Sequence, residues 1–165
     1  MKQKEKKTAW IWFFAMIIVM GIIFYFSSQS GDQSSRVSNG FFTFLLRLPP
    51  MRWTIENTPV FEILPLRKWG HLSVYFLLGI TSFGFMHQVV GSNGRAAMGA
   101  GGICFLYACS DEFHQLFVPG RAGQWKDVGI DSIGYVLGIG IWLLVLYGKH
   151  RRARKFIEKS REQKL

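Results

Sequence analysis

Charged residues are scarce in this chain of 165 residues, and the motifs of the common enzyme classes are missing. Only 18% of the residues are charged, whereas 49% are hydrophobic and 16% aromatic, a balance too apolar for an ordinary soluble domain. The sequence contains no Walker motif, no dinucleotide-binding fingerprint and no nucleophile elbow. It also contains no HExxH or similarly spaced ligand set, so we predict neither a metal site nor a cofactor.

Cysteine and proline are rare as well. The two cysteines, Cys104 and Cys109, lack CxxC or CxxH spacing, which favours buried, inert thiols over a disulfide or a metal site. Four of the five prolines fall in residues 49–65, which predicts an irregular linker. The fifth is Pro119, which with Gly120 is expected to end a helix.

The hydrophobic residues are concentrated in four long stretches. Crossing a hydrocarbon core of ~30 Å takes about 20 helical residues, so we predict an all-α, single-domain membrane bundle of four transmembrane helices. The third helix reaches this length only if it continues through the polar run DEFHQLF. The first is longer than the apolar core of a secretion signal, roughly 7 to 15 residues, and is interpreted as a retained helix. The predicted spans are residues 8–26, 71–90, 96–117 and 128–147.

The basic residues predict the orientation of this bundle. Four crossings place both termini and the turn with Arg95 on one side, which holds thirteen of the twenty Lys and Arg residues. The positive-inside rule makes that side cytoplasmic, so the protein is predicted to be a multi-pass protein of the cell membrane. Topology and anionic lipid explain the net charge of +10, and we therefore predict membrane lipids, and no nucleic acid, as partners.

Polar residues gather at the four helix ends on the opposite, extracellular side. Three of the predicted helices carry a polar stripe at helical spacing there, and Asp127 is placed as the N-cap of the last helix. Ionisable groups at membrane depth cost several kcal/mol unless they face a cavity or each other, so we predict one outward-facing ligand pocket. The predicted pocket residues are Lys68, His71, Tyr75, Asp111, Glu112, His114, Gln115, Arg121, Asp127 and Asp131.

Small residues and an amphipathic segment complete the predicted architecture. An A-x-x-x-A-x-x-x-C stripe from Ala96 and a GxxxG formed by Gly134 and Gly138 predict close helix packing. Residues 36–48 show one apolar and one polar stripe, which predicts a short amphipathic helix. This helix either lies in the outer interface or packs as a lid on the bundle. The basic tail, residues 149–165, is either a helical extension or a disordered anchor on anionic lipid.

Three of these segments resemble the VanZ-like family of small membrane proteins. KWGHLSVYFLLG from Lys68, DEFHQLFVPGR from Asp111 and DVGIDSIGYVLG from Asp127 follow the family pattern K-x-x-H, D-E-x-x-Q with P-G-R, and D-x-x-x-N-x-x-G. Asp131 stands where the family usually has Asn. The resemblance implies a role in low-level resistance to the lipoglycopeptide antibiotic teicoplanin, and it implies no reaction. The matching positions are Lys68, His71, Asp111, Glu112, Gln115, Pro119, Arg121, Asp127 and Gly134.

Three functions are open at this point. The preferred hypothesis is a cell-envelope protein whose acidic pocket binds an amphiphile, either a lipoglycopeptide antibiotic or a lipid-linked cell-wall precursor. The second is an intramembrane enzyme acting on such a precursor, with His71 or His114 as general base. The third is a structural protein in which Lys68 and Arg121 neutralise the acids.

Overall fold

The structure of the protein is a computed structural model in which two long segments and four isolated residues are described. The predicted amphipathic helix 36–48 lies almost wholly outside the described residues, and the predicted linker 49–65 lies entirely outside them. The described residues are 3–34 and 66–162, with Arg36, Gly40, Thr43 and Arg47.

Long helices account for most of the described chain. No strand occurs in its two long segments, which confirms the all-α prediction. Only Gly91 and Ser92 separate the second helix from the third, and Gly91 has the left-handed φ of 63° that glycine adopts at a helix end. The helices are α1 (Gln3–Ser27), α5 (Leu66–Val90), α6 (Asn93–Gln115) and α7 (Trp125–Glu162).

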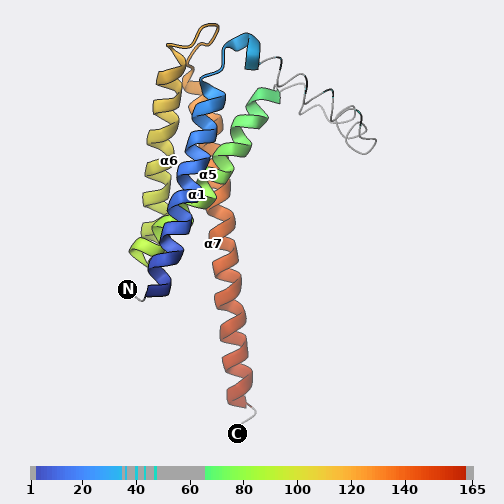
Figure 1. Cartoon of the computed structure of the whole chain (residues 1–165). Coiled ribbons are helices and arrows are strands. Elements are labelled where there is room, and N and C mark those ends of the chain that lie inside the picture. The colour runs from blue at the N-terminus through green and yellow to red at the C-terminus, as the bar shows by residue number, and fades with distance from the viewer. Residues whose placement is uncertain are drawn as a thin grey trace.

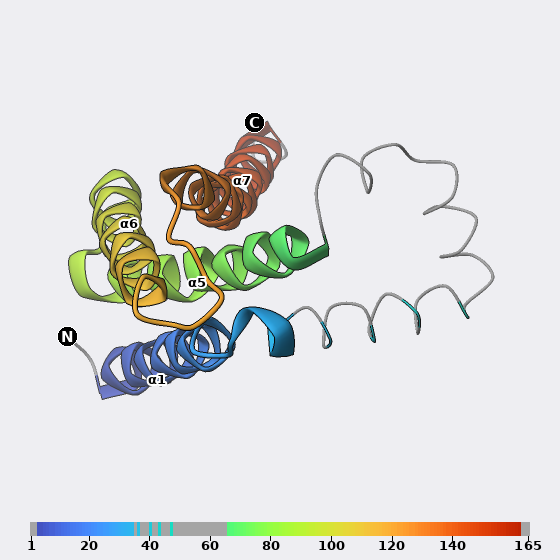
Figure 2. The same cartoon turned by 90° about the horizontal axis from the view of Figure 1, so that it is seen from above.

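The helices form a bundle with α5 at its centre. α5 packs against α1, α6 and α7, and α6 also packs against α7. Both termini lie toward one end of the bundle (Figure 1). The end of α1, the start of α5 and the loop 116–124 gather at the opposite end, which we call the loop end. Seen from above, α5 lies between α1 and α7 (Figure 2).

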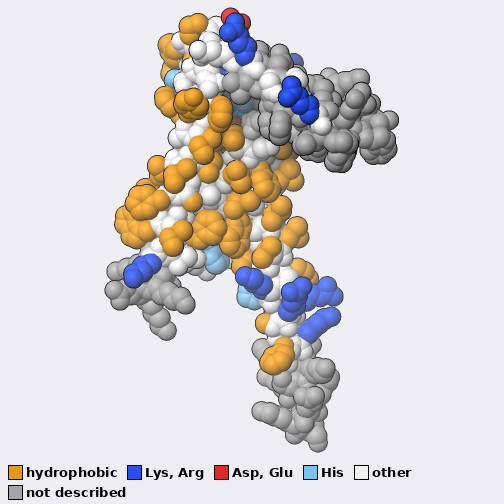
Figure 3. Space-filling model, turned by 45° about the vertical axis from the view of Figure 1, so that its right-hand side comes forward, with side chains coloured by type: hydrophobic (Ala, Val, Ile, Leu, Met, Phe, Trp, Pro, Cys, Tyr) orange, Lys and Arg blue, Asp and Glu red, His pale blue; other side chains and the backbone are white. Residues whose placement is uncertain are grey.

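Three of these helices are long and apolar enough to cross a membrane, over Lys7–Ser27, Lys68–Val90 and Trp125–Phe156. Large apolar side chains cover the outside of the bundle along much of its length (Figure 3). With 23 residues α6 has the length of a crossing, about 35 Å, but its glycines and terminal polar residues make it less apolar. A fourth crossing by α6 therefore stays a prediction.

Glycines bring α5 and α7 into close contact. A Cβ added at Gly134 would collide with the backbone oxygen of Leu72, and one at Gly138 with the backbone oxygen of Phe76. The two helices therefore approach until backbone meets backbone, as the GxxxG spacing predicts. This contact fixes the register between α5 and α7, on which the site at the loop end depends.

The small residues of α6 form its inner face, again as predicted. Ala96, Ala100, Cys104 and Ala108 are all fully buried. Both cysteines are free, and the Sγ of Cys104 lies 3.6 Å from the Oγ of Ser82. The thiols are therefore part of the packing.

The last helix is much longer than the predicted span. α7 continues to Glu162 as one unbroken helix, so the basic tail adopts the helical alternative. It projects beyond the other helices at the end where the termini lie (Figure 1).

Candidate functional site

Two ion pairs join the starts of α5 and α7 at the loop end. The Nζ of Lys68 lies 3.1 Å from Asp127 Oδ1, and the Nδ1 of His71 lies 3.5 Å from Asp131 Oδ1. Both helices begin at this end and a turn takes about 3.6 residues, so a step of three on α5 matches a step of four on α7. The K-x-x-H motif of α5 and the D-x-x-x-D motif of α7 therefore face each other, and we call their two ion pairs, Lys68–Asp127 and His71–Asp131, the ladder.

The position of Asp127 differs from the sequence prediction. α7 begins at Trp125, so Asp127 is a residue of its first turn and not its N-cap. Its backbone N–H donates to the carbonyl oxygen of Gln124, 2.8 Å away. The carboxylate still lies at the positive end of the helix dipole, and it faces Lys68 across the helix contact.

The outer pair of the ladder is expected to contribute little to stability. The side chains of Lys68 and Asp127 are 31% and 18% exposed, so water screens their attraction, and the coupling energy should be about 0.2–1 kcal/mol. A double-mutant cycle with Lys68→Met and Asp127→Asn, followed by unfolding in detergent, measures this energy. A coupling energy above about 2 kcal/mol would contradict the expectation.

The amide of Gln115 joins the two adjacent acids of α6. Its Nε2 donates to Asp111 Oδ2 at 3.2 Å and to Glu112 Oε1 at 3.3 Å, and all three side chains are buried. The other carboxylate oxygen of Glu112 accepts a hydrogen bond from the backbone N–H of Gln124 at 2.8 Å. The D-E-x-x-Q sequence therefore holds two neighbouring carboxylates in place and connects α6 to the start of α7.

The P-G-R turn that follows α6 packs on the chain just after α1. The backbone N–H of Gly31 donates to the carbonyl oxygen of Pro119 at 3.2 Å. Gly120 has a φ of 72°, which favours glycine, and a Cβ at Gly31 would collide with its carbonyl oxygen. Two glycines from distant parts of the sequence thus allow the backbones to touch.

Arg121 fastens this turn to the end of α1. Its Nη2 donates to the carbonyl oxygen of Phe26 at 2.7 Å, and its Nε donates to that of Gln29 at 2.9 Å. A third guanidinium nitrogen, Nη1, lies 3.5 Å from Gln115 Oε1. The carbonyl groups at the end of an α-helix lack partners within the helix, so the guanidinium caps α1.

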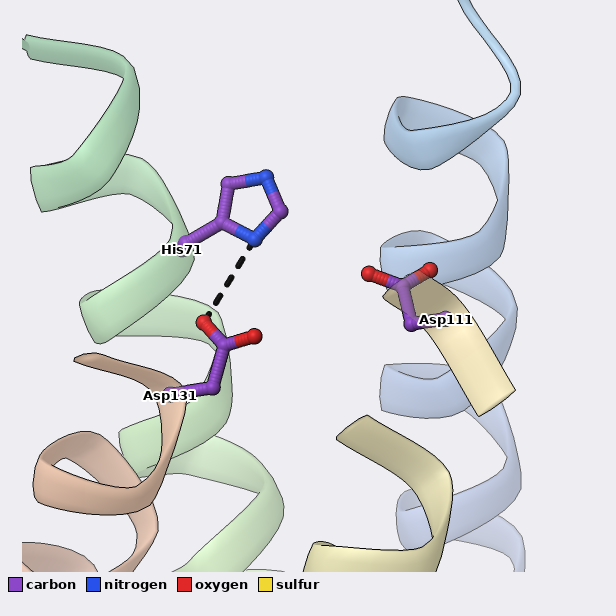
Figure 4. Close-up of side chains that lie close together, drawn as sticks. All are labelled: His71, Asp111 and Asp131. Atoms are coloured by element: carbon purple, nitrogen blue, oxygen red, sulfur yellow. Dashed lines mark ion pairs between the residues drawn. The ribbon is translucent and has the colours of Figure 1, made fainter. Parts of the chain in front are cut away.

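His71, Asp111 and Asp131 come together from three different helices (Figure 4). Each offers one ligand atom, and these atoms lie within 4.8 Å of one another. Asp111 is 4% exposed and Asp131 is 0% exposed. Tyr75, one turn after His71 on α5, is also fully buried, and the two rings stack with their centroids 6.5 Å apart.

Two buried polar groups of this cluster are incompletely paired. The Oδ1 of Asp131 faces the imidazole of His71, but within residues 3–34 and 66–162 no donor reaches its Oδ2. The hydroxyl of Tyr75 has no hydrogen-bond partner in the same segments. Buried polar atoms are normally paired, so a site with two unsatisfied groups is a candidate for binding.

Another predicted pocket residue, His114, is not part of this trio. Its ring packs against the ring of Phe24 on α1, with centroids 4.8 Å apart. The described contacts of Arg121 are with main-chain carbonyls and Gln115. No sequence pattern indicates which main-chain carbonyls accept these hydrogen bonds, because every residue carries one.

The fold and the cluster define a multi-pass helical membrane protein with buried ionisable residues at one end of its bundle. A sequence model of the VanZ/LLP1 family matches residues 12–146, most of the chain, and includes the whole cluster. The chain belongs to the VanZ/LLP1 family, as the three sequence segments predicted. Neither the curated proteins nor the solved structures contain a match to it.

Proposed function

We propose that this VanZ-like protein binds the polar head of an amphiphilic envelope molecule at the loop end of its bundle. The observation that carries the proposal is the Asp131 carboxylate, which is fully buried and whose ion-pair partner in the described segments is the imidazole of His71. Its second oxygen, Oδ2, has no hydrogen-bond donor there, and a buried charge costs several kcal/mol unless it is fully paired. A cationic or hydrogen-bonding group of a ligand supplies the remaining partner.

A purely structural role explains some of the polar residues at the loop end but not all of them. Lys68, Gln115, Glu112 and Arg121 all have partners that a purely structural role explains. The same role explains the Asp131 oxygen that faces His71 but not Oδ2, which is buried without a donor in the described segments. The binding hypothesis accounts for all five residues. The four paired residues hold the site in shape, and Asp131 contacts the ligand.

The distribution of charge supports an outward-facing site. Thirteen of the twenty Lys and Arg residues belong to the two terminal segments and the start of α6, on the side of the termini. By the positive-inside rule this side faces the cytoplasm, so the loop end faces outward. A molecule reaching the cell surface would meet the polar cluster first.

The surroundings of the cluster suit an amphiphile. A hollow of about 500 Å³ at the end of α1 offers hydrogen-bonding groups. It lies beside Arg121, whose Nε donates to the carbonyl oxygen of Gln29 in its lining. Exposed aromatic and aliphatic side chains along α1 face the acyl region, where a lipid tail would lie. A lipoglycopeptide and a lipid-linked cell-wall precursor both combine a polar head with such a tail. The hollow is lined by Tyr25, Ser28, Gln29, Gln33 and Arg36.

Substituting Glu112 by Gln tests the proposal in cells. The parent chain is expected to protect against a glycopeptide with a lipid tail. Glu112→Gln should lose that protection, because the new amide cannot accept both hydrogen bonds, from Gln115 and from the Gln124 N–H, that hold the site in shape. Survival against a glycopeptide without a tail should be the same for both. The readout is the inhibitory concentration, with membrane abundance checked for each variant.

Asp32→Asn is the matched control, since Asp32 is an exposed acid at the same end of the bundle. It should protect as well as the parent chain does. The proposal fails if Glu112→Gln protects equally well, or if the parent chain gives no protection at all.

A further inference from the structure

The most concentrated group of metal-ligating side chains in the described part of the chain is the trio His71, Asp111 and Asp131. The three come from α5, α6 and α7, so no local sequence motif could reveal them. In Figure 4 the imidazole and both carboxylates point into one common space between the helices. Their ligand atoms lie within 4.8 Å of one another.

The distances fit a small divalent ion. Two ligands on a tetrahedral ion with bonds of about 2.1 Å are about 3.4 Å apart. The Nδ1 of His71 and the Oδ1 of Asp131 are already 3.5 Å apart. The widest spacing among the three ligand atoms, 4.8 Å, would have to shorten by about 1.4 Å to reach that value.

A second observation points to the same space. The hydroxyl of Tyr75 is buried and has no hydrogen-bond partner within residues 3–34 and 66–162. Tyr75 follows His71 by one helical turn, and its ring stacks with the imidazole, with centroids 6.5 Å apart. A water molecule bound to an ion among the trio would give this hydroxyl a partner.

Charge favours a cation there. Asp111 and Asp131 bring two carboxylates into the interior of a membrane bundle, while Lys68 pairs with Asp127 nearer the surface. A divalent ion balances both buried carboxylates at once. This balance needs both acids, because an Asn at position 131 would leave only one carboxylate in the trio.

We propose that His71, Asp111 and Asp131 bind one divalent transition-metal ion of the Zn²⁺ type. One imidazole nitrogen with two carboxylate oxygens suits such an ion better than Mg²⁺ or Ca²⁺, which prefer oxygen ligands alone. Three protein ligands leave a coordination position for water or for an atom of a guest, as in zinc sites that act on substrates. The inference does not depend on amphiphile binding.

Zinc titration of the purified full chain tests this site. The protein is purified in detergent without a polyhistidine tag, stripped with a chelator and titrated with ZnCl₂ by calorimetry, and its metal content is measured by mass spectrometry. The parent chain should bind one ion per chain. His71→Gln and Asp131→Asn should each weaken binding by about tenfold or more, because each removes a ligand.

Controls separate the trio from other ligands. His150→Gln and Asp32→Asn change exposed residues and should bind zinc as the parent chain does. Circular dichroism of the metal-free variants checks that they fold. On the parent chain, Co²⁺ should give visible absorption bands that Zn²⁺ removes.

A parent chain that binds no zinc overturns the inference, and so do trio variants that bind as tightly as the parent chain. These assays contain no amphiphile, and Glu112 is not one of the proposed ligands. The metal site and the proposed function can therefore fail independently of each other.

Discussion

Replacing Arg121 by Ala is expected to lower the free energy of unfolding by about 3 kcal/mol. The guanidinium donates to two main-chain carbonyls, one in the last turn of α1 and one just after it, and a hydrogen bond from a charged donor contributes about 1.5–3 kcal/mol. Two such bonds give about 3–6 kcal/mol, and because the side chain is only half-buried we expect the lower end of that range. Thermal unfolding in detergent measures the loss. Hydrogen exchange should also show faster opening of the last turn of α1.

Two further variants give this prediction its controls. Arg121→Lys keeps the charge but has one nitrogen in place of the planar fork, so it should lose about half of the effect. Arg95→Ala removes an exposed arginine at the other end of the bundle and should stay within about 0.5 kcal/mol of the parent chain. Equal stability of Arg121→Ala and the parent chain would show that the turn is held by packing alone.

The sequence predicted much of the fold because hydrophobic length and small-residue spacing are local signals. Three helices suitable for crossing the membrane and the glycine contact between α5 and α7 follow from such signals. The sequence could not predict where α7 ends, because a basic helix and a disordered basic tail have the same composition. The fourth crossing stays a prediction because the small residues that let α6 pack also make it less apolar.

At the site, the sequence identified the residue types better than their partners. Helical spacing predicted that polar stripes from three helices lie at one depth, and His71, Asp111 and Asp131 do come together. The sequence could not assign Arg121 to main-chain carbonyls, because the end of α1 carries no side-chain signal for a cap. Nor could the sequence show that Lys68 pairs with Asp127 and not with the trio of His71, Asp111 and Asp131, because that pairing depends on the register of α5 and α7.

The close contact between α5 and α7 predicts a second large loss of stability, from alanine substitutions in the GxxxG motif of α7. Gly138→Ala is expected to destabilise the bundle by about 1–3 kcal/mol, because the new Cβ would meet the backbone oxygen of Phe76. Adding Gly134→Ala should enlarge the loss and also weaken zinc binding, since both collisions push apart the helices that carry His71 and Asp131.

Gly140→Ala is the matched control, because a Cβ at Gly140, on the same helix, meets nothing within 4 Å. Alanine favours a helix over glycine by up to about 1 kcal/mol, so Gly140→Ala should leave stability unchanged or raise it. The two substitutions add the same methyl group two residues apart, yet only Gly138→Ala is expected to lower stability. Unfolding in detergent compares them directly. A Gly138→Ala chain as stable as Gly140→Ala would mean that α5 and α7 tolerate a wider separation, and the His71–Asp131 pair would then need another explanation.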